Sequence, residues 1–153
     1  MTAVVSTNGP AALRRGSPAP AAVSLLDAAR RGLAEAMMLD PPPQRYATAH
    51  LAALRAAAAV LAARARPETT TRRRRPTSAW VLLTTVAPEL GEWATFFAAG
   101  AAKRAAAEAG LPRAVTAREA DDLLRDADTF LAVVETTLGL PSQSALPVGS
   151  RVG

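Results

Sequence analysis

The spacing of apolar residues in two long stretches constrains this chain more than any other feature. Residues 47–65 place Ala or Leu at intervals of four, three, four, three and four, and residues 120–138 repeat this spacing with Ala, Leu and Val. Such spacing puts the apolar side chains on one face of an α-helix. Half of the chain is apolar, and much of that half is alanine, the residue with the highest helix propensity. We therefore predict an all-α fold with a core of small, closely packed side chains.

The first two helices are separated by a proline run. The first is predicted to begin with Ser24 as its N-cap and to end at Leu39, before the prolines at 41–43. The second helix follows these prolines and reaches Ala65. The apolar stripes predicted for the two helices are Ala22, Leu26, Ala29, Leu33 and Ala36, and then Ala47, Leu51, Leu54, Ala58, Leu61 and Ala65.

Two further helices are expected in the middle of the chain. One covers residues 79–87, with Thr77 or Ser78 as its N-cap, and the next runs from Pro88 to Gly110. Only Pro88 separates them, so a single kinked helix is the alternative. Gly100 inside this stretch would let a neighbouring helix approach closely, at a cost of about 1 kcal/mol in helix propensity.

The last helix has the clearest boundaries. Thr116 and Glu119 form a capping box, and Gly139 and Pro141 end the helix. Its stripe is Ala120, Leu124, Ala127, Leu131, Val134 and Leu138, which Leu123 and Phe130 widen, so this helix should pack against two neighbours. Short connections between these elements predict an antiparallel bundle of four to five helices.

The domain organisation follows from composition. Residues 22–139 form the bundle, with a basic loop at 66–76. Residues 1–21 and 140–153 mix Ser, Gly, Pro and Ala without a helical period, and we predict disordered N- and C-terminal tails. The absence of cysteine excludes disulfides and thiolate chemistry. No long apolar run or signal peptide is recognisable, so we expect a cytoplasmic bacterial protein that makes no contact with a membrane.

Most of the net charge of +5 comes from four consecutive arginines, Arg72, Arg73, Arg74 and Arg75. Guanidinium groups bind phosphates in bidentate fashion, so this run is a candidate for binding RNA or a nucleotide. No aromatic residue is interleaved to stack on bases. The alternative is a solvated loop, because 17 of the 18 basic residues are arginine, as a GC-rich genome produces without selection for binding.

Arg45 and His50 are the candidate catalytic residues. A histidine can act as general acid or base, and an arginine can hold a phosphate, so the pair suits RNA cleavage through the 2′-hydroxyl. Five residues on a regular helix separate the two side chains by about 140°. This arithmetic turns Arg45 to solvent and leaves His50 at the edge of the core beside Tyr46 and Leu54. We favour that structural interpretation over catalysis.

Acidic residues are concentrated on the last helix. Glu119, Asp122 and Asp126 share one face, which is one way to hold a metal ion. Pairs of the type i,i+4, Arg118 with Asp122 and Asp121 with Arg125, explain the same residues as an exposed face laced by salt bridges. We therefore predict no metal site and no cofactor.

Two of these stretches resemble a known superfamily. The second helix, RYATAHLAALRAAAAVLAAR, looks like the second helix of HEPN domains, and TAREADDLLRDADTFLAVVETTLG resembles their closing helix. Residues 24–139 are similar to a small HEPN subfamily of GC-rich bacteria. The resemblance implies a helical bundle that dimerises and that acts as a ribonuclease or as the companion of a nucleotidyltransferase.

This sequence departs from the ribonuclease motif of the superfamily. The motif is Arg-x4-6-His near the start of a late helix. Here Arg118 is the basic residue near the matching place, and no histidine follows it. This favours a non-catalytic module, rather than an enzyme, that binds nucleic acid, a nucleotide or a protein. A ribonuclease that uses Arg45 and His50, and a purely structural or regulatory domain, are the alternatives.

Overall fold

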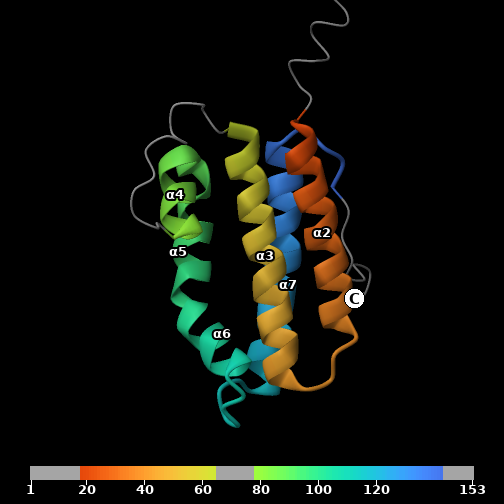
Figure 1. Ribbon diagram of the computed structural model, residues 1–153, viewed down its shortest axis with the longest axis vertical. Helices are drawn as coiled ribbons and strands as arrows, with labels where there is room; N and C mark the ends of the chain where they lie inside the picture. The colour runs from red at the N-terminus through yellow and green to blue at the C-terminus, as the bar shows by residue number, and fades with distance from the viewer. Residues whose placement is uncertain (1–17, 65–77, 143–153) are drawn as a thin grey trace, which may run out of the picture.

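Four antiparallel columns of helix build the protein (Figure 1). A computed structural model describes residues 18–64 and 78–142. The predictions for the two tails and for the basic loop fall largely outside this part of the chain. Three columns are single helices: α2 Pro20–Met37, α3 Pro42–Arg64 and α7 Ala117–Thr137. The other column, which lies between α3 and α7 in the chain, consists of α4 Ala79–Val86, η2 Pro88–Leu90, α5 Gly91–Ala99 and α6 Ala101–Glu108. The predicted all-α antiparallel bundle is confirmed.

Helix α2 packs along α3, and its buried face is the predicted one. All five residues of the predicted stripe are buried, and Gly32 joins them. A Cβ on Gly32 would lie only 3.5 Å from the Cβ of Ala52, so the two helices approach closely here. The predicted N-cap is wrong. The helix already begins at Pro20, whose missing N–H and fixed φ suit a first turn, and Ser24 lies inside the helix.

Helix α3 lies at the centre of the bundle and contacts α2, α4, α6 and α7. Its predicted stripe is wrong, because the described members of that stripe are only partly buried. The buried face is instead turned by one residue, or about 100°. It consists of Tyr46, Ala49, His50, Ala52, Ala53, Ala56, Ala57, Ala59 and Val60. Small side chains on this face allow the neighbouring backbones to come close, and the leucines fill the margins.

The third column in chain order runs from α4 to α6, and its path is broken at Ala87 and at Gly100. Ser78 caps α4 as predicted, with its hydroxyl accepting a hydrogen bond from the Trp80 N–H at 3.1 Å. Ala87, at φ −135° and ψ 74°, then breaks the helical path, so the chain on either side of Pro88 forms separate helices. A second break falls at Gly100 between α5 and α6. Gly110 ends the column in the left-handed region at φ +81°.

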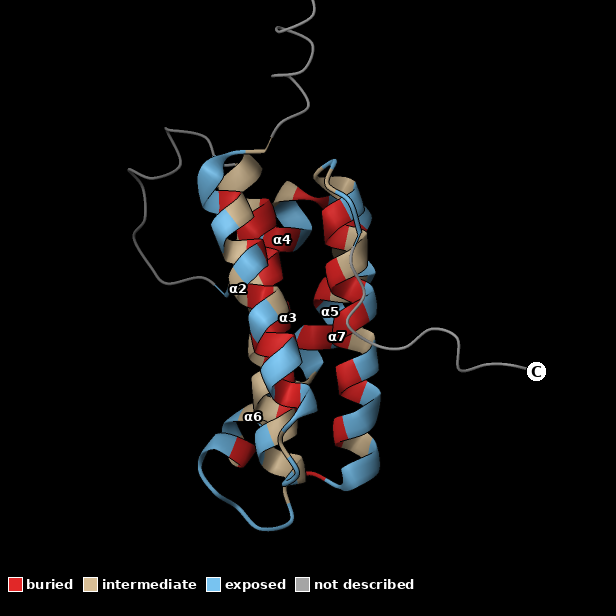
Figure 2. Cartoon of the chain, turned by 90° about the vertical axis from the view of Figure 1, so that its right-hand side faces the viewer, coloured by how far each residue is buried: buried red, intermediate tan, exposed pale blue. Residues whose placement is uncertain are grey.

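Helix α7 closes the bundle, and it has the capping box and the buried face that the sequence predicted. The capping box of Thr116 and Glu119 is present in both directions. The predicted stripe is buried except for Leu138, which is partly buried, and Leu123 and Phe130 widen it as expected. Figure 2 shows buried residues on the facing sides of the helices.

Ion pairs fasten α2 to α7 from inside the bundle. The Arg30 guanidinium donates to Asp128 at 2.7 Å and to both carboxylate oxygens of Glu135 at 2.7 and 2.8 Å. The three side chains are 6 to 13 % exposed. This pairing raises the pKa of Arg30 although burial of the side chain opposes it.

By length and composition alone, α3 is apolar enough to cross a membrane. Half of that apolar stretch is buried inside the protein, against neighbouring helices. Its position at the centre of the bundle accounts for the buried half of that stretch.

Candidate functional site

His50 is a core residue, not a boundary residue as predicted. It is 1 % exposed. Its Nε2 lies 2.8 Å from the carbonyl oxygen of Phe97 on α5, so this nitrogen carries the proton and donates it. The other nitrogen, Nδ1, is buried and has no hydrogen-bond partner among the described residues. Burial lowers the pKa of His50, although the bond to Phe97 opposes that shift, and nearby Arg104 lowers it further.

Aromatic rings enclose His50 on several sides. Tyr46 stacks on it with 6.2 Å between ring centroids, which confirms the predicted contact. Trp80 and Phe97 meet it edge-on at 6.0 and 5.9 Å. Gly100 lies directly above this cluster, because a Cβ there would be 2.6 Å from the Tyr46 hydroxyl. The close approach predicted for Gly100 is thus the one between α5–α6 and the start of α3.

Arg45 does not point to solvent, and that prediction is wrong. Its side chain is 15 % exposed and donates to the carbonyl oxygens of Leu39 and Asp40 at 2.9 and 2.8 Å. A third bond reaches the Asp121 carboxylate on α7. The helix begins at Pro42, within the proline run, and this places the Arg45 side chain over the turn that joins α2 to α3.

The two candidate catalytic side chains therefore have separate structural tasks. Arg45 ties the α2–α3 turn to α7, whereas His50 anchors α5 to α3. A general base must reach the proton that it removes. His50 has its donor bound to a backbone carbonyl and its ring enclosed, and Arg45 is bonded to other groups, so the two side chains share no partner among the residues that this structure describes.

The acidic residues of α7 have several different partners. Arg118 approaches Asp122 at 3.8 Å as predicted. The predicted pair of Asp121 with Arg125 is wrong, because Asp121 binds Arg45 and Arg125 binds Asp122 at 2.6 Å. Within residues 18–64 and 78–142, no group of three carboxylate or imidazole side chains is placed to hold a metal ion.

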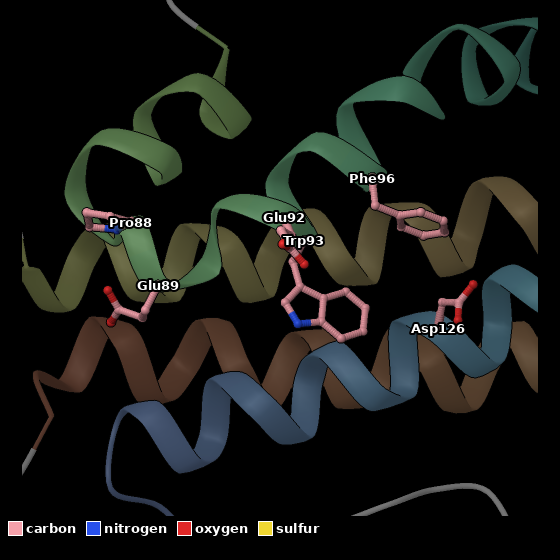
Figure 3. Close-up of a pocket in the computed structure, with 6 residues that line it drawn as sticks. All are labelled: Pro88, Glu89, Glu92, Trp93, Phe96 and Asp126. Carbon is pink, nitrogen blue, oxygen red and sulfur yellow. The ribbon is translucent and has the colours of Figure 1, made fainter.

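A groove that the sequence did not reveal lies between the third column and α7. It has a volume of about 520 Å³ and is lined by Pro88, Glu89, Glu92, Trp93, Phe96 and Asp126. Figure 3 shows the Trp93 indole reaching from α5 toward α7, with Glu89 on one side and Phe96 and Asp126 on the other. We call it the aromatic–acidic groove. The stretch of sequence that could have pointed to this groove is PELGEWATF, where two glutamates precede two aromatic residues by about one helical turn.

The carboxylates of the aromatic–acidic groove differ in their surroundings. Glu89 pairs with Arg64 at 2.8 Å, and this bond lowers the pKa of Glu89. Burial, followed by repulsion from Asp122, raises the pKa of Asp126, and Arg125 offsets part of this. Glu92 and Asp126 form no ion pair with any described residue.

The candidate nucleic-acid site lies outside the described residues, so its prediction stays a prediction. This holds for all four arginines of the run, Arg72, Arg73, Arg74 and Arg75. The described part of the chain carries ten basic and twelve acidic side chains. The positive net charge thus comes from the remaining segments, and the described surface of the bundle is slightly acidic.

These features define a class of protein: an all-helical bundle whose only histidine is a core residue and which offers a groove on one side. A comparison with models of protein families agrees with the helical fold. The model of the SAV_6107-like HEPN family matches residues 36–135, which is about two thirds of the chain. The chain therefore belongs to that family. Comparisons with curated proteins and with solved structures gave no match.

Proposed function

We propose that this protein is a non-catalytic HEPN module that acts by binding a partner and that forms a homodimer. The observation that carries the proposal is the environment of His50. A histidine that is 1 % exposed, with its Nε2 bonded to the Phe97 carbonyl, supports packing rather than proton transfer. The internal bonds of Arg45 support the same conclusion for the other candidate.

The described surface favours a protein as the partner. Val81, Leu82 and Phe96 are large apolar residues of α4 and α5 with 41 to 57 % of their area exposed. Exposed large apolar side chains of this kind are candidates for a protein interaction site. A nucleotidyltransferase-type partner, as the HEPN resemblance implies, is consistent with this surface.

The arginine run supports a second candidate function, the binding of RNA or a nucleotide. The charge density of its four members is the observation that favours it: Arg72, Arg73, Arg74 and Arg75. If the run neutralises phosphates, replacing all four residues by Ala should reduce the slope of log affinity against log salt by roughly 3 to 4. No affinity for single-stranded RNA at low salt would exclude this function.

The non-catalytic proposal is tested by incubating the purified protein with single-stranded RNA. We expect no cleavage. The variants His50→Gln, whose amide can still donate to Phe97, and Arg45→Lys are assayed beside the wild type, after their folding has been verified by circular dichroism. Cleavage that is present in the wild type and lost in both folded variants would refute the proposal. Light scattering should give twice the mass of one chain if the dimer forms.

A further inference from the structure

The aromatic–acidic groove has a chemistry that suits a cation with a flat, partly apolar surface. Trp93 is half-buried, and Phe96 is 44 % exposed although it is a large apolar residue. The Trp93 ring is itself held in place, stacked on Phe97 at 6.1 Å and tilted against Phe130 at 5.5 Å. The groove therefore presents aromatic surface on a rigid support.

Negative charge surrounds this aromatic surface from three elements. Glu89 comes from η2, Glu92 from α5 and Asp126 from α7. No basic side chain is among the described residues that line the groove. Glu92 and Asp126 form no ion pair with a described residue, although the charge of Arg125 acts on Asp126. Asp126 is half-buried, and opposite charges attract each other more strongly at a partly buried position than at a fully exposed one, because the local dielectric is lower.

One carboxylate of the groove already shows which cation it accepts. Glu89 holds the guanidinium of Arg64 at 2.8 Å, at the edge of the same groove. A guanidinium can stack on an aromatic face and at the same time donate two hydrogen bonds to a carboxylate, which an ammonium group cannot match.

We propose that the aromatic–acidic groove binds an arginine side chain from a cationic peptide segment of a partner protein. This inference rests on the proposed binding function and names the chemistry of the partner. The guanidinium would lie against the Trp93 and Phe96 rings and would be shared by Glu92 and Asp126. Charge complementarity selects this occupant, because an acidic or purely apolar segment would form no ion pair with Glu92 or Asp126.

The test uses a tetra-arginine peptide that is acetylated at its N-terminus and amidated at its C-terminus. The peptide is added to the full chain at low salt while the indole N–H resonance of Trp93 is followed by NMR. That resonance is assigned by its absence in Trp93→Phe. The titration is repeated on a chain in which the arginine run at 72–75 is replaced by Gln, so that the run cannot compete for the groove. We expect saturable binding that weakens with added salt, and weaker binding of the matching tetra-lysine peptide.

Matched variants separate the groove from general charge. Glu92→Gln with Asp126→Asn should weaken binding of the tetra-arginine peptide by about five- to tenfold. Phe96→Ala should weaken it by about threefold. The control, Glu35→Gln with Asp27→Asn, makes the same change of charge on exposed positions of α2, on the far side of α3 (Figure 1), and should leave the affinity within about twofold.

Equal loss of affinity in the groove variant and the control variant would overturn the inference. The same holds if neither chain binds the tetra-arginine peptide, or if an RNA oligonucleotide and not the peptide shifts the Trp93 resonance. These failures leave the non-catalytic proposal standing, because that proposal is refuted only by RNA cleavage that depends on His50 and Arg45. The two inferences can therefore fail separately.

Discussion

Replacing Gly100 by Ala tests the close contact between the third column and the start of α3. Gly100 has ordinary right-handed helical angles, φ −86° and ψ −3°, so alanine meets no backbone strain. The added Cβ would lie 2.6 Å from the Tyr46 hydroxyl oxygen, well inside van der Waals contact. Tyr46 is 6 % exposed and stacks on His50, so its ring cannot swing away freely.

Two opposing terms set the size of the effect. Overpacking of a well-filled core costs about 1 to 3 kcal/mol. Removing a glycine from a helical position contributes up to about 1 kcal/mol in the other direction, and less at the end of a helix. We therefore expect Gly100→Ala to lower the free energy of unfolding by about 1 kcal/mol, the difference between these two terms.

The variant Tyr46→Phe should reverse this result. Without the hydroxyl oxygen, the nearest atoms to the new Cβ are those of His50 at 3.5 and 3.6 Å, which is ordinary contact. In this background Gly100→Ala should be neutral or slightly stabilising. Urea denaturation of the wild type, both single variants and the double variant should thus give a coupling energy of about 1 to 2 kcal/mol.

Gly91→Ala provides the matched control. A Cβ there would meet only Thr84, at 3.8 Å, and the backbone is again helical. It should be neutral or stabilising by up to about 1 kcal/mol in either background. If Gly100→Ala and Gly91→Ala change stability equally, with a coupling to Tyr46 below about 0.5 kcal/mol, the proposed contact does not exist.

Three further predictions concern the core and its ion pairs. Burial lowers the pKa of His50 below the value of about 6.5 in an unfolded chain, so the unfolded state takes up the proton first as the pH falls. The free energy of unfolding, measured by urea denaturation, should therefore decrease from about pH 7.5 to about pH 5.5. The decrease should be smaller in His50→Gln. Arg30→Ala leaves Asp128 and Glu135 buried without this guanidinium and should cost about 3 to 5 kcal/mol, with partial recovery in Arg30→Lys; no measurable cost would show that the cluster contributes nothing. Leu131→Ala, at a fully buried position, should cost about 2 to 5 kcal/mol by the same assay, and a cost under about 0.5 kcal/mol would contradict its placement.

Sequence reasoning succeeded where polar and apolar residues contrast. On α7, charged residues alternate with the apolar stripe, and the capping box fixes the first turn, so both the boundary and the buried face were predictable. On α3, alanine occupies every face, and the leucines were the only strong signal. In the structure α3 packs against four neighbouring helices, and it does so with its alanines rather than its leucines, since small side chains let the helices come close together.

The error on α3 also explains the errors at Arg45 and His50. Their predicted directions were measured from a stripe that was one residue out of phase. The partners of Arg45 and His50 depend on tertiary structure, namely the path of the α2–α3 turn and the position of the Phe97 carbonyl. The aromatic–acidic groove joins Trp93 to Asp126, 33 positions away in the chain, and no local pattern predicts that meeting.

The alanine-rich buried face of α3 also determines which substitutions in this protein would change its stability. Truncation to alanine, the usual way to find important positions, leaves most of the buried face of this helix unaltered because alanine is already there. The informative direction is enlargement: replacing the methyl group of Ala52 by the isopropyl group of valine or the isobutyl group of leucine would push α2 away from α3 at Gly32. A survey by alanine substitution would therefore miss the buried alanines of α3, and a survey with valine or leucine would find those positions intolerant.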